Sequence, residues 1–77
     1  MPISAYVFIE CTAGAAKDVA RETSKIQGVR KSNSTTGPYD VIVNVQVPDL
    51  RALGELVSEQ IQIVDGVATT FTCVVSG

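Results

Sequence analysis

Valine occupies every second position from residue 41 to residue 47, and this alternation constrains the fold of the chain more than any other feature. Ile42, Asn44 and Gln46 lie between the valines. Successive side chains point to opposite faces of a β-strand, so the pattern predicts a strand with one aliphatic face and one mixed face. The aliphatic face is expected to pack against a core.

Residues 3–10 alternate in the same way and predict another strand. One of its faces is aliphatic, and the other carries two aromatic side chains, Tyr6 and Phe8. Both faces are therefore expected to meet other groups, as in a central strand with one face at an interface.

Between these two strands the pattern predicts a helix and a third strand. Residues 15–26 carry apolar side chains at helical spacing, and Gly28 follows where a left-handed residue would end the helix. The polar segment 29–35 fits an edge strand. Gly37 and Pro38 then form the turn of a hairpin that leads into the valine run.

The last third of the chain predicts a second helix and a fourth strand. Asp49 can accept amide hydrogen bonds as the N-cap of a helix. Residues 67–75 alternate again and predict a strand. The helix has an apolar stripe at steps of three and four, formed by Leu50, Leu53, Val57 and Ile61.

The order strand, helix, strand, strand, helix, strand predicts an α+β fold of the ferredoxin-like βαββαβ type. Right-handed crossovers give an antiparallel sheet of order 4-1-3-2 with both helices on one face. A length of 77 residues allows one domain, covering residues 1–77. The other face is half apolar, which predicts a sheet-to-sheet dimer, a dimeric α+β barrel. We expect it to be lined by Tyr6, Phe8, Ile42, Asn44, Thr70 and Thr72.

Composition argues against several classes of function. The chain has no His and two Cys, too few ligands for a tetrahedral zinc site and no base for a hydrolytic triad. It also has no phosphate-binding glycine loop. From these observations together we expect no metal, no cofactor and no catalytic site. The net charge of −2 argues against direct nucleic-acid binding. No apolar stretch approaches the ~20 residues that cross a bilayer, so we expect a cytoplasmic protein.

The two cysteines are expected to stay reduced and separate. In the predicted antiparallel pairing of the first and fourth strands, Cys73 lies near Ala5 and Cys11 near Val67. About six residues of strand, roughly 20 Å, then separate the thiols, too far for a disulfide. Cys73 is expected to be a small core residue.

The hairpin turn, residues 36–40, holds the one group of residues that points to a binding site. Gly37 allows the backbone to expose amides, Tyr39 offers an aromatic wall, and Asp40 supplies a carboxylate for an ammonium group. These are the parts of an amino-acid site. The alternative is an ordinary hairpin turn in which Tyr39 packs as an edge residue.

The sequence of this turn, with the segments around it, resembles that of the effector-binding domain of the Lrp/AsnC transcription regulators. The resemblance implies a domain that dimerises through its sheets, assembles into rings of dimers and binds amino acids between neighbouring dimers. It also implies Gly37, Tyr39, Asp40, Thr70 and Thr72 as ligand-binding residues. The segments that carry the resemblance span nearly the whole chain: Ile26 to Val29 as I-x-G-V, Thr36 to Val45, Asp49 to Leu53, and Ile61 to Thr72.

The first predicted strand begins at Ile3, so no DNA-binding domain is expected before it. By this resemblance, the chain is a stand-alone amino-acid-binding and oligomerisation module that modulates the regulation of amino acid metabolism through a full-length Lrp/AsnC partner. Two alternatives remain at this point. One is a small dimeric α+β barrel enzyme of the monooxygenase or isomerase type, and the other is a purely structural oligomerisation protein.

Overall fold

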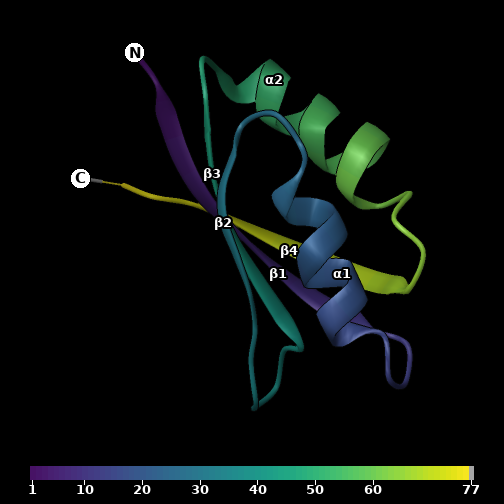
Figure 1. Cartoon of the computed structure of the whole chain (residues 1–77). Coiled ribbons are helices and arrows are strands. Elements are labelled where there is room, and N and C mark those ends of the chain that lie inside the picture. The colour runs from purple at the N-terminus through teal and green to yellow at the C-terminus, as the bar shows by residue number, and fades with distance from the viewer. Residues whose placement is uncertain (77) are drawn as a thin grey trace.

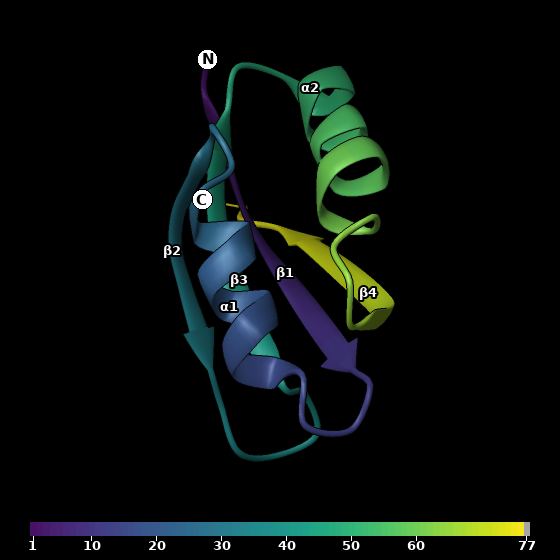
Figure 2. The ribbon, with the colours of Figure 1, turned by 45° about the vertical axis from the view of Figure 1, so that its right-hand side comes forward.

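The computed structural model describes residues 1–76 and contains four strands that form one antiparallel sheet. The sheet has the order β2-β3-β1-β4, as predicted, and the helices pack on one of its faces (Figure 1). Turned by 45°, the first helix lies low in front of the strands, and the second helical segment lies above it and to its right (Figure 2). The elements are β1 Ile3–Cys11, α1 Ala16–Ser24, β2 Val29–Ser34, β3 Val41–Val47, α2 Leu50–Glu55, η1 Leu56–Ile61 and β4 Val67–Val74.

The core forms where the aliphatic faces of the two central strands meet the helices. Alternate residues of β1 and all four valines of β3 are buried. α1 adds Val19 and Thr23, which are fully buried. The Thr23 hydroxyl hydrogen-bonds to the Val19 carbonyl at 2.8 Å, so its polar oxygen is satisfied inside the core. The predicted alternation therefore places the core correctly.

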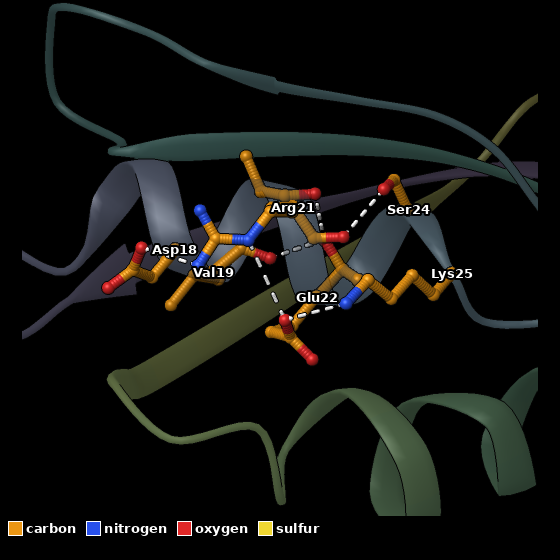
Figure 3. A network of polar contacts seen from close by, with 8 residues as sticks. Asp18, Val19, Arg21, Glu22, Ser24 and Lys25 are labelled. Atoms are coloured by element: carbon orange, nitrogen blue, oxygen red, sulfur yellow. Dashed lines mark hydrogen bonds and ion pairs between the residues drawn. The ribbon is translucent and has the colours of Figure 1, made fainter.

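The outer side of α1 is a solvated face of paired charges (Figure 3). Arg21 bonds to Asp18 at 2.8 Å, and Lys25 bonds to Glu22 at 3.0 Å. These pairs are exposed and contribute little to stability. The helix ends at Ser24, before the predicted glycine. Gly28 has a φ of +99° but serves the turn into β2, so the prediction that it ends the helix is wrong.

The second helix begins as predicted and then changes its winding. The Asp49 carboxylate accepts a hydrogen bond from the Ala52 amide at 2.8 Å, as an N-cap does. η1 is π-helical, and it ends with the Gln62 amide bonded to the Val57 carbonyl five residues back, at 2.9 Å.

The predicted apolar stripe of this helix is wrong at one position and incomplete at another. Leu50 is 62% exposed, whereas Leu56 is buried with the other stripe residues. The spacing of apolar residues defines the inward direction of a helix, but it does not say which turns lie over the sheet. Leu50 is the first residue of α2, and its side chain is exposed to solvent.

A β-bulge decides which side chains of β4 lie on the open face, meaning the sheet face opposite the helices. Cys11 pairs with Val67, as predicted, but Glu10 pairs with Thr69, so Ala68 is an extra residue on β4. A shift of one residue moves every following side chain to the other face. Phe71 and Cys73 therefore pair with the open-face aromatics of β1, at Phe8 and Tyr6.

Two expectations are corrected by this shift. Thr72 pairs with Val7 and Thr70 with Ile9, so both threonines lie on the helix side of the sheet and not on the open face. Cys73 is exposed on the open face and is not a core residue. Among residues 1–76, no helix is long and apolar enough to cross a membrane.

Candidate functional site

The β2–β3 hairpin turn is closed by hydrogen bonds on both sides of Gly37. The Thr35 amide donates to the Asp40 carbonyl at 2.8 Å, and the Thr35 hydroxyl donates to the Tyr39 carbonyl at 2.8 Å. Gly37 has a φ of +134°, a conformation that side chains disfavour, which explains a glycine there. The turn therefore has one defined shape, with Gly37 exposed at its tip.

Asp40 ties the turn to the end of β1 through both its backbone and its side chain. Its amide donates to the Ile9 carbonyl at 2.9 Å. Its Oδ2 accepts the backbone N–H of Cys11 at 2.7 Å, a short charge-assisted hydrogen bond. The other oxygen, Oδ1, makes no hydrogen bond to the residues that the structure describes. The carboxylate is thus held in place with one oxygen available to a ligand.

Tyr39 packs between two aromatic side chains of the sheet. Its ring centroid lies 5.0 Å from that of Phe8 and 5.7 Å from that of Phe71. We call these three residues the aromatic cluster. It occupies the open face at the turn end of the sheet, and its spacings are typical of stabilising aromatic pairs. The ring of Tyr39 is therefore held by packing, and the next residue in the chain is Asp40 with its fixed carboxylate.

The five residues expected to bind a ligand do not all come together in one chain. Gly37, Tyr39 and Asp40 are neighbours in the turn. Thr70 lies on the other side of the sheet, where its hydroxyl accepts a hydrogen bond from the Gln62 side chain at 2.9 Å. It lines a separate crevice of about 390 Å³ beside the end of η1. Thr72 is exposed on that same side.

Sequence reasoning missed the residues that hold the turn. Phe8 and Phe71 come from different strands and meet Tyr39 only because of the strand register. The Cys11 amide lies 29 positions from Asp40. Thr35 is the residue of this set that sequence alone could have identified, because a hydroxyl side chain before a turn commonly bonds to the backbone inside the turn.

Cys11 gives the turn a measurable chemical property. Burial, and secondarily the negative charge of Asp40, raises the pKa of the Cys11 thiol above its ordinary value. In a Cys73→Ser background, Asp40→Asn is expected to speed alkylation of Cys11 at pH 8 by about two- to threefold, because the thiolate fraction rises. The reaction is followed by mass spectrometry. Glu10→Gln, which removes the carboxylate next to Cys11 in sequence, is the control and should leave the rate unchanged; equal rates in all three proteins would contradict the assigned proximity.

A hollow of about 630 Å³ lies between α1 and the start of the turn, lined in part by Thr35 and Thr36. A cleft of about 440 Å³ is at the opposite end of β3, between Gly28, Pro48 and the helix residue Leu56. Within residues 1–76, no group of three His, Cys, Asp or Glu side chains is placed to hold a metal ion. The hairpin turn is therefore the place where a fixed carboxylate, an aromatic ring and exposed backbone meet.

Comparison with known proteins identifies relatives of the whole fold. A protein of Thermus thermophilus superimposes with a TM-score of 0.91 at 27% identity, over 97% of this chain and 94% of that chain. A transcriptional regulator of Neisseria meningitidis, solved in complex with L-Met, superimposes with a TM-score of 0.86 at 19% identity. That match covers 97% of this chain and 50% of the regulator, and at this identity it shows the fold alone.

Sequence similarity also reaches an enzyme. The chain is 32% identical over 74 residues to a homocitrate synthase of Saccharolobus islandicus. The match covers 95% of this chain and 16% of the synthase, so the chain spans about one sixth of that relative. The family model described as the Lrp/AsnC ligand binding domain matches residues 4–77. The chain therefore belongs to the Lrp/AsnC ligand-binding domain family, as its turn residues and topology led us to expect.

Proposed function

We propose that this domain binds a free amino acid at the β2–β3 hairpin turn. The observation that carries the proposal is the state of the Asp40 carboxylate. One oxygen is fixed by the Cys11 amide at 2.7 Å, and the other has no hydrogen bond from the described residues. A carboxylate held in this way is organised in advance for an ammonium group, so binding does not have to order it first.

The rest of the turn supplies the other contacts that an amino acid needs. The ring of Tyr39 is held by the aromatic cluster and presents an apolar wall to a ligand side chain. The backbone around Gly37 is exposed and can donate amides to a ligand carboxylate. The L-Met complex of the Neisseria regulator, which shares this fold, supports an amino acid as the ligand class.

We further propose that two copies associate through their open faces and that the dimers assemble into a ring. The open face carries Tyr6 and Phe71, which are 43% and 49% exposed. Exposed aromatic side chains on one face are typical of an interface. Thr70 and Thr72 lie on the helix side, so in this proposal they contact a ligand that the turn of a neighbouring dimer holds.

The proposed role is regulation through a partner and not catalysis. The sequence has no His, which leaves it without the commonest general base. One candidate partner is a full-length Lrp/AsnC regulator that co-assembles with this domain. A second is a biosynthetic enzyme, because a homocitrate synthase contains a segment 32% identical to this chain. Native mass spectrometry of this chain mixed with a full-length regulator, and separately with a homocitrate synthase, distinguishes the two: mixed oligomers in either sample support that partner, and their absence rejects it.

Isothermal titration with each common amino acid tests the binding site. At least one amino acid is expected to bind the wild-type protein, and Asp40→Asn should bind it about 10- to 100-fold more weakly, the value of a charge-assisted hydrogen bond. The control is Asp49→Asn, because Asp49 caps α2 far from the turn and Asn caps equally well. This control should bind as the wild type does.

Two results would remove the proposal. One is a wild-type protein that binds none of the amino acids, and the other is an Asp40→Asn variant that binds as tightly as the wild type. Circular dichroism of the variant verifies that the fold is retained, since the amide oxygen of the substituted side chain can still accept the Cys11 N–H.

A further inference from the structure

A hollow lies on the open face beside the aromatic cluster, since its lining residue Ile42 is paired with Phe8. Its volume is about 280 Å³. Lys31 and Asn44 are paired across β2 and β3, as are Asn33 and Ile42. Because paired residues share a face, these side chains surround one depression together with a ring of β1. The lining residues are Tyr6, Lys31, Asn33, Ile42 and Asn44.

Every polar side chain around this hollow can donate a hydrogen bond, and Lys31 adds a positive charge. Lys31 offers an ammonium, Asn33 an amide and Tyr6 a hydroxyl. The Asn44 amide already donates to the Ala5 carbonyl at 3.2 Å, which fixes its orientation and leaves a second N–H for a ligand. Ile42 contributes an apolar patch between these donors. The chemistry of the hollow thus favours a negatively charged group attached to a carbon skeleton.

No carboxylate of the described chain neutralises Lys31. The ion pairs among residues 1–76 use the cations of Arg21, Lys25 and Arg51. Glu10, on the same face, accepts a hydrogen bond from the Thr69 hydroxyl. It lies four positions along β1 from Tyr6, about 13 Å at the rise of a strand. If a second copy covers the open face, an ammonium here needs an anionic partner, because burying an unpaired charge is costly.

We propose that this hollow binds a small organic carboxylate, with Lys31 holding the carboxylate and the Asn33 and Asn44 amides donating to it. The apolar Ile42 and the Tyr6 ring favour an organic carboxylate over inorganic phosphate. This site differs from the hairpin turn, because its lining includes none of Gly37, Tyr39 and Asp40. Covering of the open face by a second copy encloses the hollow and strengthens the pairing.

Nuclear magnetic resonance titration with butyrate, and separately with inorganic phosphate, tests this site on the full chain. Butyrate is expected to shift the side-chain amide signals of Asn33 and Asn44 in the wild-type protein. Lys31→Met, which keeps most of the length of the side chain and removes its charge, should weaken butyrate binding at least fivefold. Lys17→Met is the matched control on exposed α1 and should bind butyrate as the wild type does.

The titration has outcomes that would overturn the proposed site and one that would overturn its ligand class. Unshifted amides in the wild-type protein, or equal butyrate binding by Lys31→Met, overturn the proposal. Tighter binding of phosphate than of butyrate overturns the carboxylate class. Asp40→Asn is expected to bind butyrate normally, so a failure of the amino-acid site at the turn is distinguishable from a failure of this one.

Discussion

Phe71→Asp is expected to break the proposed open-face dimer while the chain stays folded. Phe71 is 49% exposed and lies on the open face beside Phe8 and Tyr39. In the proposed dimer this ring is buried against a second copy, and a carboxylate there would be desolvated without a partner. Self-association is expected to weaken at least ~100-fold, the equivalent of about 3 kcal/mol. Sedimentation equilibrium at micromolar protein concentration measures the change.

The matched control is the neighbouring substitution Thr72→Asp. Thr72 is also exposed, but it pairs with Val7 on the helix side of the sheet. The same charge placed there should leave the open-face dimer intact, even where it disrupts the proposed contact between dimers. A wild-type protein that is already monomeric at these concentrations, or an association constant that Phe71→Asp leaves unchanged, would show that the open face is not an interface.

Gly66→Ala is expected to destabilise the fold strongly. Gly66 has a φ of +102°, and a Cβ built there would lie 2.7 Å from the Cβ of Ala15 and 3.0 Å from the Cγ2 of Val19. These atoms sit at the start of α1 and in the buried core. The unfavourable φ costs about 1–2 kcal/mol and the overpacking about 1–3 kcal/mol. We therefore expect a loss of about 2–5 kcal/mol in the free energy of unfolding, measured in urea.

Gly14→Ala separates the two causes of this loss. Gly14 also has a positive φ, +79°, but a Cβ built there has no atom within 4 Å. The control should therefore lose only the conformational part, about 1–2 kcal/mol. Equal losses in the two variants would mean that the approach of Gly66 to α1 is not tight. A domain of this size has a total stability of roughly 4–12 kcal/mol, so Gly66→Ala is also expected to lower the folded population and with it ligand binding.

Alternation and turn residues made most of the fold predictable. Strands are recognisable by a period of two, and the valine run of β3 shows this period without ambiguity. The Asp49 cap and the turn at Gly37 also depend on interactions within a few residues. Caps and turns can be recognised because they depend on short stretches of sequence. The right-handed crossover rule then gives the order of the strands in the sheet.

The open face was only partly predictable, because it depends on pairing between distant segments. The bulge at Ala68 leaves no mark in the sequence, yet it exchanges the faces of every later residue of β4. Without it, Thr70 would pair with Phe8 and Thr72 with Tyr6. The bulge instead brings Phe71 to the open face.

The candidate site shows the same limit. Gly37, Tyr39 and Asp40 are adjacent in sequence, so their chemistry was predictable as a group. Their setting was not, because Tyr39 packs against β1 and β4 and Asp40 bonds to an amide 29 positions away. These contacts depend on the register in which the strands are paired. They turn a simple hairpin turn into a rigid corner that a small ligand can use.

The most direct test of the amino-acid site is to map where a bound amino acid touches the protein. Amide signals of the isotopically labelled chain are recorded during titration with the amino acid that binds most tightly in calorimetry. The largest shifts are expected at Gly37, Tyr39 and Asp40, with a further shift of the Cys11 amide that bonds to Asp40. Shifts concentrated at the cleft between Gly28 and Leu56, with the turn unaffected, would contradict the assignment.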